Sequence, residues 1–129
     1  MKMNTVLDAS ALLALLHNEQ GTDKVADAIL NKAAISSVNW TEVIQKAIAN
    51  NINIENLNQD LAALGLTYFD FDMQQAHIAG NLWQQTKPFG LSLGDRACLA
   101  LAIHLDLPVL TADKIWAQLD IGVPVRLIR

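Results

Sequence analysis

Short apolar runs alternate with longer segments of helical periodicity along the chain, and this alternation strongly limits the possible folds. The runs, which we predict to be strands, cover residues 3–7, 33–37, 66–71, 108–111 and 123–128. Continuous apolar runs of this length are typical of parallel strands that are buried on both faces. We therefore predict an α/β fold with a mostly parallel central sheet of about four to five strands, flanked by helices.

The segments between these runs carry strong helix formers and apolar residues at helical spacing. The predicted helices cover residues 9–17, 22–32, 39–50, 54–64, 73–86, 93–105 and 113–119. We expect Asn39 to open the third helix and Gly65 to cap the fourth. The helix over 93–105 is apolar on nearly all sides, which predicts a central, buried position.

Composition indicates one ordinary globular domain over residues 1–129, with no repeat or linker. Apolar residues make up 52% of the 129 residues and charged residues only 17%, below the usual charged share of about 25%. Cys98 is the single cysteine, and we predict that it fills part of the core. No segment approaches the roughly 20 apolar residues that cross a bilayer. We therefore expect a soluble cytoplasmic protein that does not bind a membrane.

Net charge argues against one class of function. A charge of −4 disfavours tight, non-specific binding to a phosphate backbone. It does not exclude a nuclease, because carboxylates that hold a divalent cation become locally attractive to phosphate.

Four acidic residues occupy the positions where a parallel sheet forms its ligand crevice, beyond the carboxyl ends of the strands. Asp8 ends the first predicted strand, and Asp113 follows the fourth. Glu42 and Asp95 lie in the predicted first turns of two helices. We therefore expect the four side chains to meet at one edge of the sheet.

Helix capping offers a local explanation for each acid. Asp8 and Asp113 fit N-cap positions, and the patterns N-x-x-E at 39–42 and S-x-x-D at 92–95 have capping-box spacing. Capping does not require four acids at one edge, however, and such acids repel one another unless a hard cation lies between them. Oxygen ligands suit Mg²⁺ or Mn²⁺. A cation of this kind can activate water for attack on a phosphodiester.

Polar neighbours of the acids support this interpretation. The hydroxyls of Ser10 and Thr111 can hydrogen-bond a carboxylate or a water, although such residues are also common in helix turns. Arg96 and Lys114 each follow a site acid, and we predict that they meet a substrate phosphate or neutralise the neighbouring carboxylate.

Four segments resemble, in the same order, the motifs of PIN-domain proteins, especially VapC-type toxins of bacterial toxin–antitoxin pairs. The matching segments are residues 6–14, 37–43, 92–102 and 110–117. The resemblance implies a Mg²⁺- or Mn²⁺-dependent endoribonuclease in which Asp8, Glu42, Asp95 and Asp113 hold the metal and activate water. It further implies that Ser10 and Thr111 assist. Some family members carry another acid where this chain has Ile115.

The resemblance also implies partners. Toxins of this kind form homodimers, cut tRNA or other RNA so that translation stops, and are blocked by a cognate antitoxin protein. One alternative is a non-catalytic PIN module that binds RNA or protein. Another is a Mg²⁺-binding receiver-like phosphoacceptor domain, which would need an acidic pair after the first strand and a late lysine. A haloacid-dehalogenase-like site would need Asp-x-Asp, but position 10 is serine.

Overall fold

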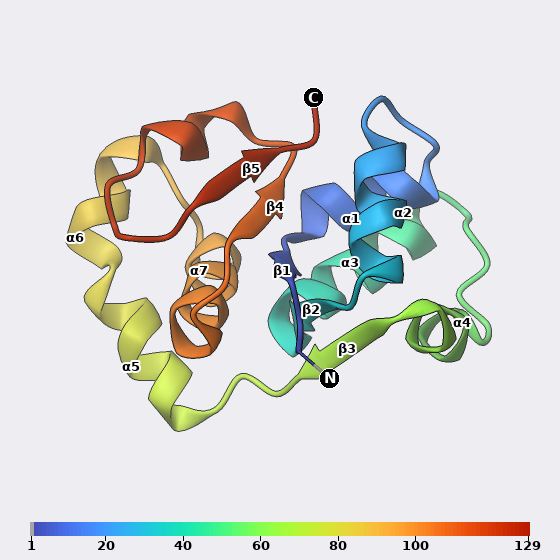
Figure 1. The fold of residues 1–129 in the computed structure, drawn as a ribbon, viewed down its shortest axis with the longest axis horizontal. Helices are drawn as coiled ribbons and strands as arrows, with labels where there is room; N and C mark the ends of the chain where they lie inside the picture. The colour runs from blue at the N-terminus through green and yellow to red at the C-terminus, as the bar shows by residue number, and fades with distance from the viewer. Residues whose placement is uncertain (1) are drawn as a thin grey trace.

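The apolar runs form one five-stranded sheet with the order β3-β2-β1-β4-β5. All four neighbouring pairs are parallel, so the predicted fold class is confirmed. The computed structural model describes residues 2–129 (Figure 1). The strands are β1 (Thr5–Leu7), β2 (Ala33–Ser36), β3 (Leu66–Phe69), β4 (Val109–Thr111) and β5 (Val125–Leu127).

Helices cover both faces of the sheet, as Figure 1 shows. One side carries α1 (Ala9–Leu16), α2 (Thr22–Leu30), α3 (Ser37–Ala49) and α4 (Leu57–Leu64). The other side carries α5 (Met73–Asn81), α6 (Trp83–Thr86) and α7 (Leu93–Leu105), with the 3₁₀ turns η1 (Lys87–Phe89) and η2 (Lys114–Gln118). Within residues 2–129, no helix combines the length and apolar character needed to cross a membrane.

Alternate strand residues fill two separate cores. Val6 of β1 and Val109 of β4 belong to the cluster that contains Leu99 and Leu101 of α7. Leu7, the next residue of β1, belongs to the cluster on the α1–α4 side. Both strands are buried at every residue, which explains why β1 and β4 contain no charged residue.

The start of α3 differs from the prediction. The helix begins at Ser37 and is capped by Ser36, whose hydroxyl accepts the Val38 N–H at 3.2 Å. Asn39 is therefore inside the helix, and Glu42 lies in its second turn. The prediction was wrong because Ser36 ends a strand and caps a helix at once, so no loop separates the two elements.

The predicted helix over 73–86 is divided. Its first part ends at Asn81, and α6 begins at Trp83 after Leu82. Gly80 and Asn81 are weak helix formers, which explains an interruption at this point. The α-helical segment ends at Thr86 as predicted, and Pro88 lies in the 3₁₀ turn η1 that follows.

Gly65 offers a test of the packing between α4 and α2. Its φ is +131°, and a Cβ there would overlap the carbonyl oxygen of Ile29. We expect Gly65→Ala to lower the free energy of unfolding by more than about 3 kcal/mol, because strain and collision add. The measurement is urea denaturation.

Gly90 provides the matched control for this substitution. Its φ is +70°, but no atom lies within 4 Å of a Cβ built there. Gly90→Ala should therefore cost only the backbone strain, about 1 kcal/mol. Equal losses for the two variants would show that the contact with Ile29 is unimportant.

Candidate active site

The side chain of Asp8 lies at the end of β1, where the chain turns directly into α1. Its backbone is extended, and its carboxylate accepts the Ala11 N–H at 2.9 Å as the N-cap of α1. The residue is only 4% exposed. A carboxylate with so little contact with water needs several hydrogen-bond donors.

Two hydroxyl groups supply these donors and also join two strand ends. Ser10 Oγ donates to Asp8 at 2.8 Å, and Thr111 Oγ1 donates to Asp8 Oδ2 at 2.5 Å. The same hydroxyls accept the backbone N–H groups of Ala112 and Asp113, both at 3.0 Å. The junction after β1 and the junction after β4 are therefore held together by Ser10 and Thr111.

Burial is the main influence on the protonation of Asp8. It raises the pKa of this carboxyl group from 3.8 to about 6. The hydrogen bonds from Thr111, Ala11 and Ser10 act in the opposite direction. The negative charge of Asp95 raises the pKa slightly further, which indicates that Asp8 and Asp95 are electrostatic neighbours.

Asp95 is held at the start of α7 by a capping box. Its carboxylate accepts the Ser92 N–H at 2.9 Å, and Ser92 Oγ accepts the Asp95 N–H at 3.1 Å. The predicted capping pattern at 92–95 is therefore confirmed. The carboxylate is partly buried and oriented by its own backbone.

Glu42 approaches the same turn of α7 from α3. A Cβ built on Gly94 would lie 2.6 Å from Glu42 Oε1, so the carboxylate occupies the space that a side chain at position 94 would fill. Asn39 Nδ2 donates to Glu42 Oε1 at 2.9 Å. Glu42 therefore lies beside the residue that precedes Asp95.

Cys98 lies one turn after Asp95 and is fully buried. Burial raises the pKa of its thiol well above the usual value. The negative charges of Asp8, Asp95 and Glu42 raise this pKa further. Three acids from three different elements therefore influence one thiol of α7. Cys98 itself is a core residue, as predicted.

Asp113 is placed differently. It is exposed and caps η2 by accepting the Ile115 N–H at 3.1 Å. Asp113 is linked to Asp8 through Thr111. The Asp113 backbone N–H donates to the Thr111 hydroxyl, which in turn donates to the Asp8 carboxylate.

Within residues 2–129, no three acidic, histidine or cysteine side chains are close enough to form a ready metal centre. Each of the four carboxylates is instead held by its own hydrogen bonds. The group nevertheless offers only oxygen donors, which fits Mg²⁺ or Mn²⁺ and not a softer metal.

The comparison with known families decides the identity of this fold. The model of the PIN domain matches residues 5–122. This chain belongs to the PIN domain family. The match excludes the receiver-like and dehalogenase-like alternatives. No curated protein sequence matches the chain.

Solved structures share this PIN fold at low sequence identity. A toxin–antitoxin complex from Klebsiella pneumoniae has a TM-score of 0.78 and 23% identity, covering 98% of each chain. DNA-bound VapBC from Salmonella typhimurium has a TM-score of 0.75 and 17% identity, covering 98% of this chain and 99% of that one. FitAcB from Neisseria gonorrhoeae has a TM-score of 0.69 and 22% identity, covering 94% and 95%.

The basic side chains next to the site acids point to different roles. Arg96 Nη1 donates to the carbonyl oxygen of Ala79 at 3.1 Å, so its guanidinium helps to join α5 to α7 in this PIN domain. Its predicted contact with a substrate phosphate remains a prediction. Lys114 is exposed next to Asp113, at the open side of the site.

Two residues of the site were misjudged or missed from the sequence. Asn39 was assigned as a helix cap, but its amide contacts Glu42 and Gly94. Gly94 was not considered at all. The available signal was a glycine directly before an acid, inside a helix otherwise composed of good helix formers.

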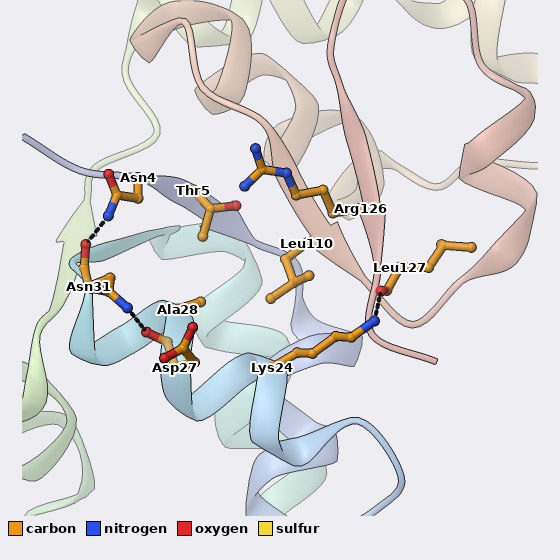
Figure 2. A pocket seen from close by; sticks show the side chains of 9 residues that line it. All are labelled: Asn4, Thr5, Lys24, Asp27, Ala28, Asn31, Leu110, Arg126 and Leu127. Atoms are coloured by element: carbon orange, nitrogen blue, oxygen red, sulfur yellow. Dashed lines mark hydrogen bonds between the residues drawn. The ribbon is translucent and has the colours of Figure 1, made fainter.

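A cleft of about 580 Å³ lies elsewhere, between α2 and the strands β4 and β5 (Figure 2). It includes Asn4 and Thr5 at the start of β1, whereas Asp8 follows the end of that strand. Figure 2 shows Lys24 reaching across the cleft to the Leu127 carbonyl oxygen, at 3.4 Å. None of the four candidate acids lines this cleft, so it is separate from the carboxylate site.

The raised pKa of Asp8 predicts a pH-dependent stability. The folded protein holds the Asp8 proton more tightly than the unfolded chain, so this stabilisation is complete below about pH 4 and is lost as pH rises through about 6. Without divalent metal, wild type should lose about 2 kcal/mol relative to Asp8→Asn between about pH 4 and pH 7. Urea denaturation of both proteins in EDTA measures this difference, and parallel pH profiles would contradict it.

Proposed function

We propose that this PIN domain is a Mg²⁺- or Mn²⁺-dependent endoribonuclease that hydrolyses RNA phosphodiester bonds. The observation that carries the proposal is the convergence of Asp8, Glu42 and Asp95 on the first turns of α7. Glu42 lies against Gly94, the residue before Asp95, and the charges of Asp8, Asp95 and Glu42 all raise the pKa of the Cys98 thiol. Asp113 completes the set at the exposed rim.

Asp8, Glu42 and Asp95 would hold the divalent cation, with Asp113 beside them. When bound, the cation supplies positive charge that attracts a phosphate, and it makes water more acidic. The neighbouring residues orient the carboxylates. Ser10 and Thr111 donate to Asp8, which favours its ionised form and fixes the direction of its oxygens. This support offsets part of the effect of burial on the pKa of Asp8.

The exposed rim is the side from which RNA would arrive. Asp113 and Lys114 are exposed there, and Lys114 carries the positive charge that a phosphate requires. The chain as a whole has a net charge of −4, so long-range attraction of RNA is weak. Cleavage would therefore depend on the cation and on a shape-selected target such as tRNA or another structured RNA.

The role in the cell that we propose is that of a toxin. Structures similar to this chain come from toxin–antitoxin complexes, and some were solved with DNA bound. We propose that this chain likewise forms a homodimer, is blocked by a cognate antitoxin protein, and stops translation when released. A non-catalytic PIN module that binds RNA or protein is the alternative outcome of the experiments below.

Asp95→Asn tests the enzymatic activity. The asparagine oxygen still accepts the Ser92 N–H, so the capping box and the fold should persist, while one anionic ligand is lost. We expect cleavage of an RNA mixture in Mg²⁺ to fall at least about 100-fold, and EDTA to abolish cleavage by wild type.

Asp106→Asn is the matched control at the other end of the same helix. Asp106 is the C-cap of α7, with a φ of 56° that asparagine tolerates. The Asp106→Asn variant should cleave RNA as wild type does. Cleavage by Asp95→Asn at the wild-type rate would place the active site elsewhere, and no cleavage by wild type would favour the non-catalytic module.

Growth on expression tests the toxin role. Induction of wild type should arrest growth, because RNA cleavage stops translation. Asp8→Asn should relieve the arrest at an equal protein level, since the buried ligand at the end of β1 becomes neutral. The measurement is colony formation with immunoblotting. Normal growth with active wild-type ribonuclease present would point to general RNA processing.

A further inference from the structure

The amide of Asn39 links two helices at the position of Glu42. Nδ2 donates to Glu42 Oε1 and to the Gly94 carbonyl oxygen, both at 2.9 Å. Because both partners are acceptors, only the NH₂ group can occupy this place. Asn39 is 1% exposed, so the surrounding core holds the amide in position.

Gly94 forms the other side of the same small space. Its backbone does not require glycine, since its φ is not among the positive values found at Gly21, Gly65, Gly90 and Gly122. A Cβ at this position would lie 2.6 Å from Glu42 Oε1 and 2.8 Å from Oε2. The lack of a side chain is what makes room for the carboxylate.

Both residues lower stability where they stand. The oxygen of the Asn39 amide, Oδ1, is buried and has no hydrogen-bond partner within the described chain, which is unfavourable for a polar atom. Glycine in a helix is also unfavourable, because it loses more conformational freedom on folding than alanine does. What both residues provide in return is a fixed position for the Glu42 carboxylate.

We infer that Asn39 and Gly94 are positioning residues, which hold the Glu42 carboxylate beside the first turn of α7 so that it completes the cation site with Asp8 and Asp95. This inference rests on the proposed metal-dependent function. Asp8 and Asp95 are oriented by the helices that they cap. Glu42 lies in the second turn of α3 and caps no helix, so its long side chain needs this separate support.

Cation affinity depends on how far the ligands are ordered in advance. Fixing a free glutamate side chain costs conformational entropy. The hydrogen bond from Asn39 and the space beside Gly94 order the Glu42 side chain when the protein folds, before any cation binds. Losing either should therefore weaken cation binding without unfolding the protein.

Mn²⁺ binding to the full chain, measured by isothermal titration calorimetry, tests the inference. Asn39→Leu removes the donor at similar volume, and Gly94→Ala places a methyl group against the carboxylate. Each should weaken Mn²⁺ binding about tenfold or more. Gly94→Ala should also keep or raise the melting temperature, because alanine favours a helix. A purely structural role of Gly94 would instead lower it.

Two variants of the same chemical type serve as controls. Asn50→Leu removes an exposed amide whose Nδ2 donates to the Lys46 carbonyl oxygen, at the far end of α3. Gly80→Ala adds a methyl group to a glycine of α5 that has no atom within 4 Å of a built Cβ. Both should bind Mn²⁺ as wild type does.

A double-mutant cycle shows whether the two residues act through Glu42. In the Glu42→Ala background, Asn39→Leu and Gly94→Ala should cause no further loss of Mn²⁺ affinity. Additive losses, or Mn²⁺ binding as tight as wild type in the single variants, would overturn the inference alone. A wild-type chain that binds no Mn²⁺ would overturn the proposed function as well.

The metal-free protein gives an independent measurement. The side-chain NH₂ signals of Asn39 in NMR spectra, assigned by their loss in Asn39→Leu, should shift in Glu42→Ala and in Gly94→Ala. They should stay in place in Asn50→Leu and Gly80→Ala. Unchanged Asn39 signals in Glu42→Ala would show that the hydrogen bond to Glu42 is not formed, which also overturns the inference.

Discussion

The burial of the Asp8 carboxylate governs the arrangement at the carboxyl edge of the sheet. A carboxylate at 4% exposure is tolerable only with donors around it, and these come from α1, from Ser10 and from Thr111. The two hydroxyls also accept backbone N–H groups after β4. One buried carboxylate therefore joins the junction after β1 to the junction after β4.

Capping and the proposed metal chemistry are compatible uses of the same carboxylates. Asp8, Asp95 and Asp113 each accept a backbone N–H at the start of a helix or turn, and a carboxylate oxygen has further lone pairs for a cation. The cap orients the ligand at little cost. Glu42 is the exception, and its support by Asn39 and Gly94 carries costs in stability that the caps do not.

Local patterns were sufficient for much of the fold. The five strands and α7 were predicted because each is rich in apolar residues, so that its burial is largely evident from its own residues. The start of α3 was misplaced because Ser36 ends β2 and caps α3 within one residue. The helix over 73–86 was predicted as continuous, because the preferences of Gly80 and Asn81 are too weak to predict a break by themselves.

The sequence by itself determined that Asp8, Asp95 and Asp113 stand at strand ends or helix starts, because those positions depend on neighbours in the chain. Only the tertiary structure decided which of them meet. Asn39 contacts Gly94 across 55 positions, and Arg96 turns to Ala79 of α5 and not to an acid. These contacts depend on how α7 packs against α3 and α5, and packing between elements distant in the chain leaves no local pattern.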